Sequence, residues 1–173
     1  HKSDAKAVKL NIQTEDELAQ AYHEVRQNAL NEKPDADISG VLIEEMVDKG
    51  VEVIIGVKSD PQFGPVVMFG MGGVFVEVFE DVSLRVAPVS RQDAIEMIKE
   101  TKGYSVLRGV RGEKRADIDA IVDVITNVSK LALDLKDEIS EIDINPLIVR
   151  EAGEGATAAD ALIVLKNNLD EGV

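Results

Sequence analysis

The most informative stretch of the sequence is Glu141-Ile142-Asp143-Ile144-Asn145-Pro146, which lies within a strand-like run from Ile139 to Val149. Successive side chains of a β-strand point to opposite faces of its sheet. The alternation therefore predicts that the acidic and amide side chains of this stretch share one face and that its isoleucines share the other. Three oxygen-bearing side chains would then lie on one surface.

A second strand-like run, Ala156 to Leu165, follows the turn-forming residues 150–155 and predicts a hairpin. On this returning strand, Asp160 is placed to face Asn145. Carboxylate and amide oxygens suit Mg²⁺, which takes few protein ligands and completes its coordination with water and substrate phosphates. The residues alone leave two interpretations open, a magnesium site or a solvated strand face in an acidic protein. The second is the more common meaning of such a pattern.

Further strands and helices are predicted along the rest of the chain. Thr14 and Ser90 are expected to cap helices, and Asp48-Lys49-Gly50 is expected to form a hairpin turn. The predicted strands occur in runs with helices set between them, and strands and helices do not alternate one by one. The expected fold class is therefore α+β with a largely antiparallel sheet. The periodicity predicts strands at 7–12, 41–47, 51–57, 66–69, 74–79 and 82–86, and helices at 14–30, 91–101 and 117–135.

Composition excludes several classes of function. The 173 residues are enough for one domain or for two lobes. The 33 acidic residues exceed the 19 Lys and Arg residues, and the net charge of −14 disfavours binding to nucleic acid or to anionic membranes. The absence of cysteine excludes disulfides and thiolate chemistry. No apolar run is long enough to span a membrane, and a cytoplasmic location is expected. Since the chain begins with His1, we expect a fragment or a processed chain.

Two glycine-containing segments are candidates for binding phosphate. The glycines of Phe69-Gly70-Met71-Gly72-Gly73 allow the backbone to approach anionic oxygens, although a tight β-turn explains such a pattern more often. Arg108-Gly109-Val110-Arg111-Gly112 places two of the chain's few arginines among glycines, and Arg85 is a third candidate. The alternative for these arginines is surface ion pairing.

The segment Ile43-Glu44-Glu45-Met46-Val47 is a candidate adenine-binding edge. At the end of a strand, its backbone would be available for hydrogen bonds to the base. Glu52, just beyond the predicted turn, would accept hydrogen bonds from ribose hydroxyls. An ordinary amphipathic hairpin explains the same residues equally well.

Taken together, these motifs resemble one family, the β subunits of ADP-forming acetyl-CoA synthetases, which are ATP-grasp proteins. The matching motifs occur in the family's order and cover the whole chain, although family members carry a further segment before the first of them. The resemblance implies an ATP-grasp fold, with part of the N-terminal lobe in residues 1–39, the C-terminal lobe in 40–166 and a polar tail in 167–173. The motifs are His1-Lys2-Ser3-Asp4, Asp60-Pro61-Gln62-Phe63-Gly64-Pro65, Phe69–Gly73, Arg108–Gly112, Glu141–Pro146 and Ala159-Asp160-Ala161.

The resemblance also implies an activity and partners. Family members interconvert acyl-CoA, ADP and phosphate with acid, CoA and ATP, with Mg²⁺ as cofactor and acetyl-CoA as the expected acyl-CoA. A CoA-binding α subunit supplies the first phosphohistidine, and a heterotetramer of the two subunits is expected.

Roles for individual residues follow from the same resemblance. His1 matches the histidine that carries the phosphoryl group between subunits, and Arg111 would neutralise charge during the transfer. The remaining matches are Asp143, Asn145 and Asp160 for Mg²⁺ and nucleotide phosphates, Glu44, Glu45, Met46 and Val47 for adenine, and Glu52 for ribose.

A different class of protein also resembles this sequence, namely non-catalytic ATP-grasp modules that regulate or bind a CoA-binding or acetyltransferase protein. The two classes differ in whether the phosphoryl-carrying histidine and the metal-binding residues are all present. Since His1, Asp143, Asn145 and Asp160 are all present, the sequence favours the enzyme.

Overall fold

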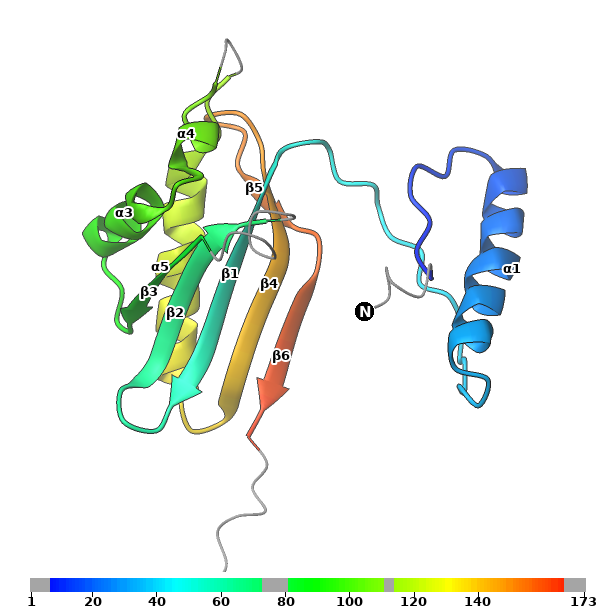
Figure 1. Ribbon diagram of the computed structural model, residues 1–173, viewed down its shortest axis with the longest axis horizontal. Helices are drawn as coiled ribbons and strands as arrows, with labels where there is room; N and C mark the ends of the chain where they lie inside the picture. The colour runs from blue at the N-terminus through cyan, green and yellow to red at the C-terminus, as the bar shows by residue number, and fades with distance from the viewer. Residues whose placement is uncertain (1–6, 73–80, 111–113, 167–173) are drawn as a thin grey trace, which may run out of the picture. The chain divides into compact units, whose positions relative to one another are not determined.

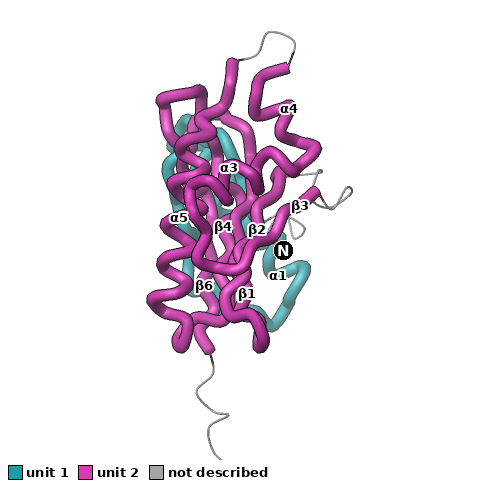
Figure 2. The backbone as a smooth tube through the Cα atoms, turned by 90° about the vertical axis from the view of Figure 1, so that its left-hand side faces the viewer, with its two compact units in different colours: residues 1–46 teal, residues 47–173 magenta. Residues whose placement is uncertain are grey.

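The structure is a computed structural model that describes residues 7–72, 81–110 and 114–166 (Figure 1). The chain forms two compact units, residues 1–46 and 47–173, which are coloured teal and magenta in Figure 2. The first unit is built around one helix, whereas the second contains an antiparallel sheet covered by helices. The predicted domain limits at residues 39 and 166 stay a prediction about ATP-grasp lobes.

Helix α1 (Glu15–Glu32) is the regular element of the first unit and confirms the helix predicted at 14–30. It begins at a capping box. The Thr14 side chain accepts a hydrogen bond from the backbone N–H of Glu17 at 3.2 Å, and the Glu17 carboxylate accepts one from the backbone N–H of Thr14 at 3.3 Å. These two bonds satisfy N–H groups that a helix end leaves without intrahelical partners.

Two strands predicted in the N-terminal part are wrong. Residues 7–13 and 36–50 contain no regular secondary structure, so the hairpin turn predicted at Asp48–Gly50 is also absent. Asn11 has a φ of 60°, which interrupts an extended backbone. The apolar side chains that suggested strands are exposed, with 65% exposure at Leu10 and 79% at Leu42. Alternation of apolar residues produces a strand only where another strand pairs with it, and these segments pair with none of the described residues.

The sheet of the second unit is antiparallel at every described pairing, which confirms the expected fold class. Its strand order is β3-β2-β1-β4-β5, and β6 also pairs with β4 (Figure 1). The run predicted as one strand at 156–165 is divided into two, and the strand predicted at 74–79 lies outside the described residues. The strands are β1 (Val51–Asp60), β2 (Gly64–Met71), β3 (Val82–Val86), β4 (Ile139–Val149), β5 (Ala156–Ala158) and β6 (Ala161–Leu165).

Three helices follow β3 in the second unit. Helix α3 (Arg91–Glu100) is capped by Ser90, as predicted, and Asp93 completes a capping box with it. Helix α5 (Ile118–Asp134) has Asp117 as its N-cap and buries an apolar stripe that includes Ile121 and Ile125. The short helix α4 (Tyr104–Leu107) was not predicted, because four residues are too few to show a helical period.

The two faces of the sheet differ in what covers them. On the helix face, defined by Val57, Val67, Phe69 and Ile142, apolar side chains pack with α3 and α5 into one buried core (Figure 1). On each of these strands the adjacent side chains point to the opposite face of the sheet, which we call the open face. The paired residues Leu84, Met68, Gly56, Asp143 and Leu162 form a row across this open face, which no helix of the second unit's described residues covers.

Candidate functional site

The candidate site lies where two neighbouring strands are interrupted together. The pairing of β1 with β4 shifts register between Val53 and Ile55, so that β4 has one extra residue near Asn145 and Pro146. Such a β-bulge bends a strand and changes the direction of its side chains, and bulges are frequent beside active sites. The break between β5 and β6 occurs opposite this bulge, at Ala159 and Asp160.

Backbone hydrogen bonds hold the two interruptions together. The N–H of Asn145 donates to the carbonyl oxygen of Asp160 at 3.1 Å, and the N–H of Ala159 donates to the carbonyl oxygen of Pro146 at 3.0 Å. Asp160 therefore lies opposite Asn145, as the sequence predicts. The division of the predicted single strand into β5 and β6 has the same cause, because the residues facing a bulge cannot continue a regular ladder.

Asp143 is half-buried on the open face and has other carboxylates near it. Burial raises the pKa of the Asp143 carboxyl, and the negative charges of Glu141 and Asp160 raise it further. These carboxylates are thus close enough to repel one another. A bound cation would relieve this repulsion, and Asp143, Asp160 and the amide oxygen of Asn145 are ligands of the kind that Mg²⁺ accepts.

The described residues contain no group of three or more His, Cys, Asp or Glu side chains arranged to hold a metal ion. The candidate set is two aspartates and one asparagine. This small set fits Mg²⁺, which usually keeps several waters and is bound by one or two carboxylates together with substrate phosphates.

Glu52, the candidate ribose ligand, is an exposed residue of β1. Its carbonyl oxygen accepts a hydrogen bond from the N–H of Gly72 at 2.8 Å. A Cβ atom placed on Gly72 would lie 2.8 Å from the Cβ of Glu52, so a side chain at position 72 would collide with β1. Close approach of two chain segments thus explains Gly72, while Gly73 lies outside the described residues.

The candidate adenine segment has a different local structure from the one expected. Glu44, Glu45, Met46 and Val47 lie in the irregular segment that precedes β1, not at the end of a strand. Glu44, Glu45 and Met46 are exposed and belong to the first unit, whereas Val47 belongs to the second. Their assignment to adenine stays a prediction.

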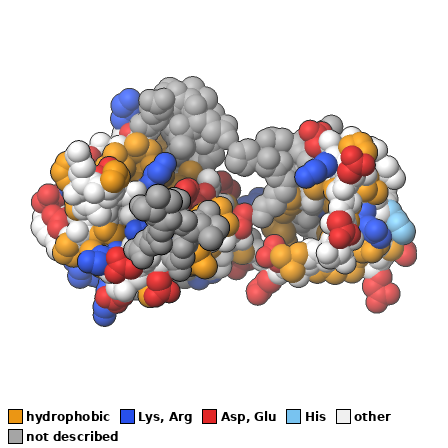
Figure 3. All heavy atoms as spheres, turned by 90° about the horizontal axis from the view of Figure 1, so that it is seen from below, with side chains coloured by type: hydrophobic (Ala, Val, Ile, Leu, Met, Phe, Trp, Pro, Cys, Tyr) orange, Lys and Arg blue, Asp and Glu red, His pale blue; other side chains and the backbone are white. Residues whose placement is uncertain are grey.

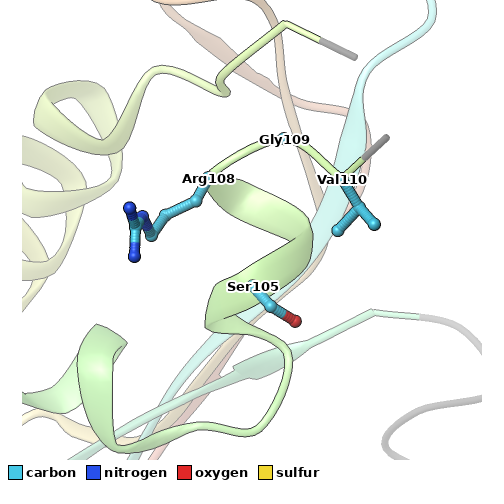
Figure 4. A pocket seen from close by; sticks show the side chains of 4 residues that line it. All are labelled: Ser105, Arg108, Gly109 and Val110. Atoms are coloured by element: carbon cyan, nitrogen blue, oxygen red, sulfur yellow. The ribbon is translucent and has the colours of Figure 1, made fainter. Parts of the chain in front are cut away.

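The two candidate arginines that the structure describes, Arg85 and Arg108, have protein partners. Arg85 forms an ion pair with Glu100, which supports the surface-pairing alternative for this residue. The Arg108 guanidinium lies 6.0 Å from the centre of the Tyr104 ring. A pocket beside helix α4 is lined by Ser105, Arg108, Gly109 and Val110. Within this group, the Arg108 side chain points in the opposite direction from the side chains of Ser105 and Val110 (Figure 4). The candidates Arg111 and His1 lie outside the described residues.

Two buried aspartates were not recognised from the sequence as functional candidates. Asp81 accepts hydrogen bonds from the N–H groups of Lys102 and Gly103, both at 2.8 Å. Asp117 accepts hydrogen bonds from three backbone N–H groups. Both carboxylates therefore join segments that are distant in sequence. For Asp117 the available signal was its position at the start of a predicted helix.

Asp and Glu side chains are spread over the face seen in Figure 3, with Lys and Arg side chains between them.

None of the helices that the structure describes has the length and apolar character needed to cross a membrane.

Comparison with known proteins defines the class. The ATP-grasp domain family matches residues 1–165. The chain is 54% identical over 166 residues to the acetate–CoA ligase [ADP-forming] II subunit beta of Pyrococcus furiosus, and 53% identical over 165 residues to the corresponding subunit of ligase I. These matches cover 96% and 95% of this chain and 70% of each relative.

Solved structures agree with this class. A protein from Pyrococcus horikoshii is 53% identical with a TM-score of 0.88, and the match covers 96% of this chain and 70% of that one. Acetyl-coenzyme A synthetase 1 of Candidatus Korarchaeum cryptofilum, in complex with coenzyme A and Mg-AMPPCP, is 45% identical with a TM-score of 0.81. That match covers 96% of this chain and 71% of that one. In that structure the phosphohistidine segment points towards the nucleotide-binding site.

The chain belongs to the ATP-grasp family of ADP-forming acetate–CoA ligase β subunits. The resemblance recognised in the sequence, the ATP-grasp fold and the class of enzyme are therefore confirmed.

Proposed function

We propose that this chain is the nucleotide-binding part of an acid–thiol ligase that interconverts acyl-CoA, ADP and phosphate with acid, CoA and ATP. The observation that carries the proposal is the paired interruption of β4 and β5–β6. It brings Asn145 and Asp160 together beside the half-buried carboxylate of Asp143. Membership of the ADP-forming ligase β subunits supports the same activity, with acetyl-CoA as the expected acyl-CoA.

The three residues would bind Mg²⁺ together with the phosphates of the nucleotide. When bound, the metal neutralises charge on the transferring phosphoryl group. Asp143 and Asp160 would supply anionic oxygens, and Asn145 would supply a neutral one. The charge repulsion around Asp143 favours a cation over an anion at this position.

Further residues complete the proposal. His1 would carry the phosphoryl group and Arg111 would stabilise its charge. Glu44, Glu45, Met46 and Val47 would bind adenine, and Glu52 would bind ribose. The relatives named as β subunits imply a partner α subunit, which would bind CoA. We expect the two subunits to form a heterotetramer in the cytoplasm.

The test is substitution of Asp160 in the complete enzyme, with ATP formation measured from acyl-CoA, ADP and phosphate. Asp160 is exposed, so Asp160→Ala removes a carboxylate without removing a core contact. We expect kcat/KM to fall by about 100-fold, since loss of a metal ligand weakens charge stabilisation in the transition state. The control is Asp137→Ala, which removes the same charge from the exposed turn before β4.

Equal activity of the Asp160→Ala and Asp137→Ala enzymes would remove Asp160 from the site. Absence of ATP formation by the wild-type complete enzyme would favour the alternative, a nucleotide-binding or regulatory module. A panel of acyl-CoAs in the same assay identifies the acid substrate.

A further inference from the structure

Asp117 is a buried carboxylate with two structural tasks. Only 8% of the residue is exposed. Its Oδ1 atom accepts a hydrogen bond from the N–H of Ala120 at 3.0 Å and thereby caps helix α5. One carboxylate oxygen is sufficient for a helix cap, as serine and threonine caps demonstrate. The second oxygen is therefore available for another contact.

That second oxygen holds the loop that joins β4 to β5. Oδ2 accepts hydrogen bonds from the N–H groups of Gly153 and Gly155, both at 2.9 Å. Both glycines have positive φ, 89° and 79°, in the region that residues with side chains rarely adopt. The loop thus has a specific backbone shape, in which two N–H groups converge on one oxygen atom.

Neighbouring backbone bonds attach the same loop to the segment around Asp117. The N–H of Asp117 donates to the carbonyl oxygen of Arg150 at 2.9 Å. The N–H of Ala152 donates to the carbonyl oxygen of Arg115 at 2.9 Å. The loop is consequently fixed to the N-terminal end of α5 at several points. The side-chain contacts among them are those of the Asp117 carboxylate and the ion pair of Lys114 with Glu151.

The loop leads directly to Asp160. Strand β5 has three residues, and its pairing with β4 runs from Val149–Ala156 to Leu147–Ala158. Ala159 and Asp160 follow and face the bulge of β4. Two backbone hydrogen bonds hold Ala159 and Asp160 against β4. Because so short a strand as β5 contributes few further ladder bonds, the way in which the preceding loop is held also affects the position of Asp160.

We propose that Asp117 is a positioning residue for the metal site, which fixes the 150–155 loop and through β5 sets the position of Asp160. This inference rests on the proposed function of Asp160. Asp117 itself would touch neither the metal nor the nucleotide.

The ionisation of Asp117 agrees with this role. Burial alone would raise the pKa of its carboxyl, but hydrogen bonds from the N–H groups of Gly155, Ala120 and Gly153 outweigh that effect and lower the pKa below its ordinary value. The group is therefore a carboxylate at neutral pH, able to accept all of these bonds.

The substitution Asp117→Asn separates the capping of helix α5 from the contacts with the 150–155 loop. Asparagine is as good an N-cap as aspartate, so helix α5 keeps its first turn. The asparagine side chain has one oxygen, and its NH₂ group cannot accept hydrogen bonds from the N–H groups of Gly153 and Gly155. The matched control is Asp119→Asn, the same chemical change at an exposed carboxylate two residues further along.

The experiment measures magnesium dependence and loop order in the complete enzyme. We expect Asp117→Asn to raise the Mg²⁺ concentration for half-maximal ATP formation by about 10-fold, as for residues that orient metal ligands. At saturating Mg²⁺, kcat should recover to near the wild-type value. Without any turnover, hydrogen–deuterium exchange in residues 150–160 should become faster, and the rise in Tm on adding Mg²⁺ and ADP should shrink. Asp119→Asn should change none of these.

Several outcomes would overturn the positioning role. They are an unchanged magnesium response, a fall in kcat that excess Mg²⁺ does not restore, and effects equal to those of Asp119→Asn. If Asp117→Asn fails to fold, Asp117→Ser provides the test, because serine caps the helix but cannot reach the loop glycines as well. Failure of both variants to fold would assign Asp117 a purely structural role.

The result also separates this inference from the proposed function. Full activity of Asp160→Ala would contradict the role proposed for Asp160 in the metal site, on which this inference rests. A normal magnesium response of Asp117→Asn, in an enzyme that does require Asp160, would contradict only the positioning role.

Discussion

Two adjacent residues of β4 show the difference between the faces of the sheet. Ile142 is 3% exposed on the helix face, where it lies in the core. Asp143, the next residue, lies on the open face beside other carboxylates, and burial together with their charge raises its pKa. Ile142 pairs with Val57, and Asp143 pairs with Gly56. The same two strands thus contribute apolar contacts to one face and polar groups to the other.

This difference separates stability from function within one strand. Burial of apolar surface on the helix face stabilises the fold. The carboxylates of the open face repel one another and oppose folding. We therefore expect substitutions on the helix face to act mainly on the free energy of unfolding, and substitutions on the open face to act mainly on binding and activity.

Among substitutions of the two adjacent residues of β4, the largest effect is expected from Ile142→Ala. Removing a buried isoleucine side chain leaves a cavity in a packed core, and the free energy of unfolding should fall by about 2 to 5 kcal/mol. Urea denaturation measures it. The matched control is Ile163→Ala, because Ile163 pairs directly with Ile142 but is 49% exposed. Equal losses of unfolding free energy for the two variants would show that the side chains of β6 are as well packed as those of β4. That result would contradict the difference in exposure between Ile142 and Ile163.

A smaller effect is expected from Asp143→Asn, and it depends on pH. Because the pKa of Asp143 is raised in the folded protein, the folded state holds the proton more tightly than the unfolded state. In the wild type, the free energy of unfolding should therefore fall as pH rises from the ordinary pKa of 3.8 through the raised value. The variant should lose this decline and gain stability relative to the wild type at neutral pH.

Thermal denaturation at a series of pH values measures this effect, with Asp137→Asn, at an exposed turn, as the control. Mg²⁺ with ADP should raise the Tm of the wild type more than that of Asp143→Asn, because in the proposed site the cation would bind the ionised carboxylate. A variant that keeps the wild-type pH dependence would show that repulsion around Asp143 does not affect stability.

Elements with a strong local signal were predictable from the sequence. The capping boxes at Thr14 and Ser90 and the apolar stripe of α5 gave helices close to the observed limits. The hairpin of β4 with β5 and β6, and the approach of Asp160 to Asn145, followed from strand periodicity and turn residues.

Features that depend on distant partners were not predictable in this way. The apolar residues at 8–12 and 41–47 have the period of strands, but no described strand pairs with them. The bulge near Asn145 arises from register against β1, which no local pattern reveals. The contacts of Asp117 with Gly153 and Gly155 likewise join residues more than thirty positions apart. The roles assigned to His1 and Arg111 came from resemblance, and both residues lie outside the described part of the chain.

The smallest expected effect is that of Leu84→Thr on the open face of β3. Leu84 is 54% exposed and pairs with Met68, whereas the adjacent pair, Ser83 with Phe69, is buried on the helix face. Threonine is β-branched and therefore suits a strand. Substitutions at exposed positions outside the core usually change the free energy of unfolding by less than about 0.5 kcal/mol. We therefore expect urea denaturation of Leu84→Thr to match the wild type, while Phe69→Ala, one strand away, should lose about 3 to 5 kcal/mol. A loss above about 1 kcal/mol for Leu84→Thr would mean that another part of the protein covers this end of the open face, because only burial gives a leucine side chain that much stabilising free energy. The difference between a buried helix face and an uncovered open face would then hold at β4 but not across the whole sheet.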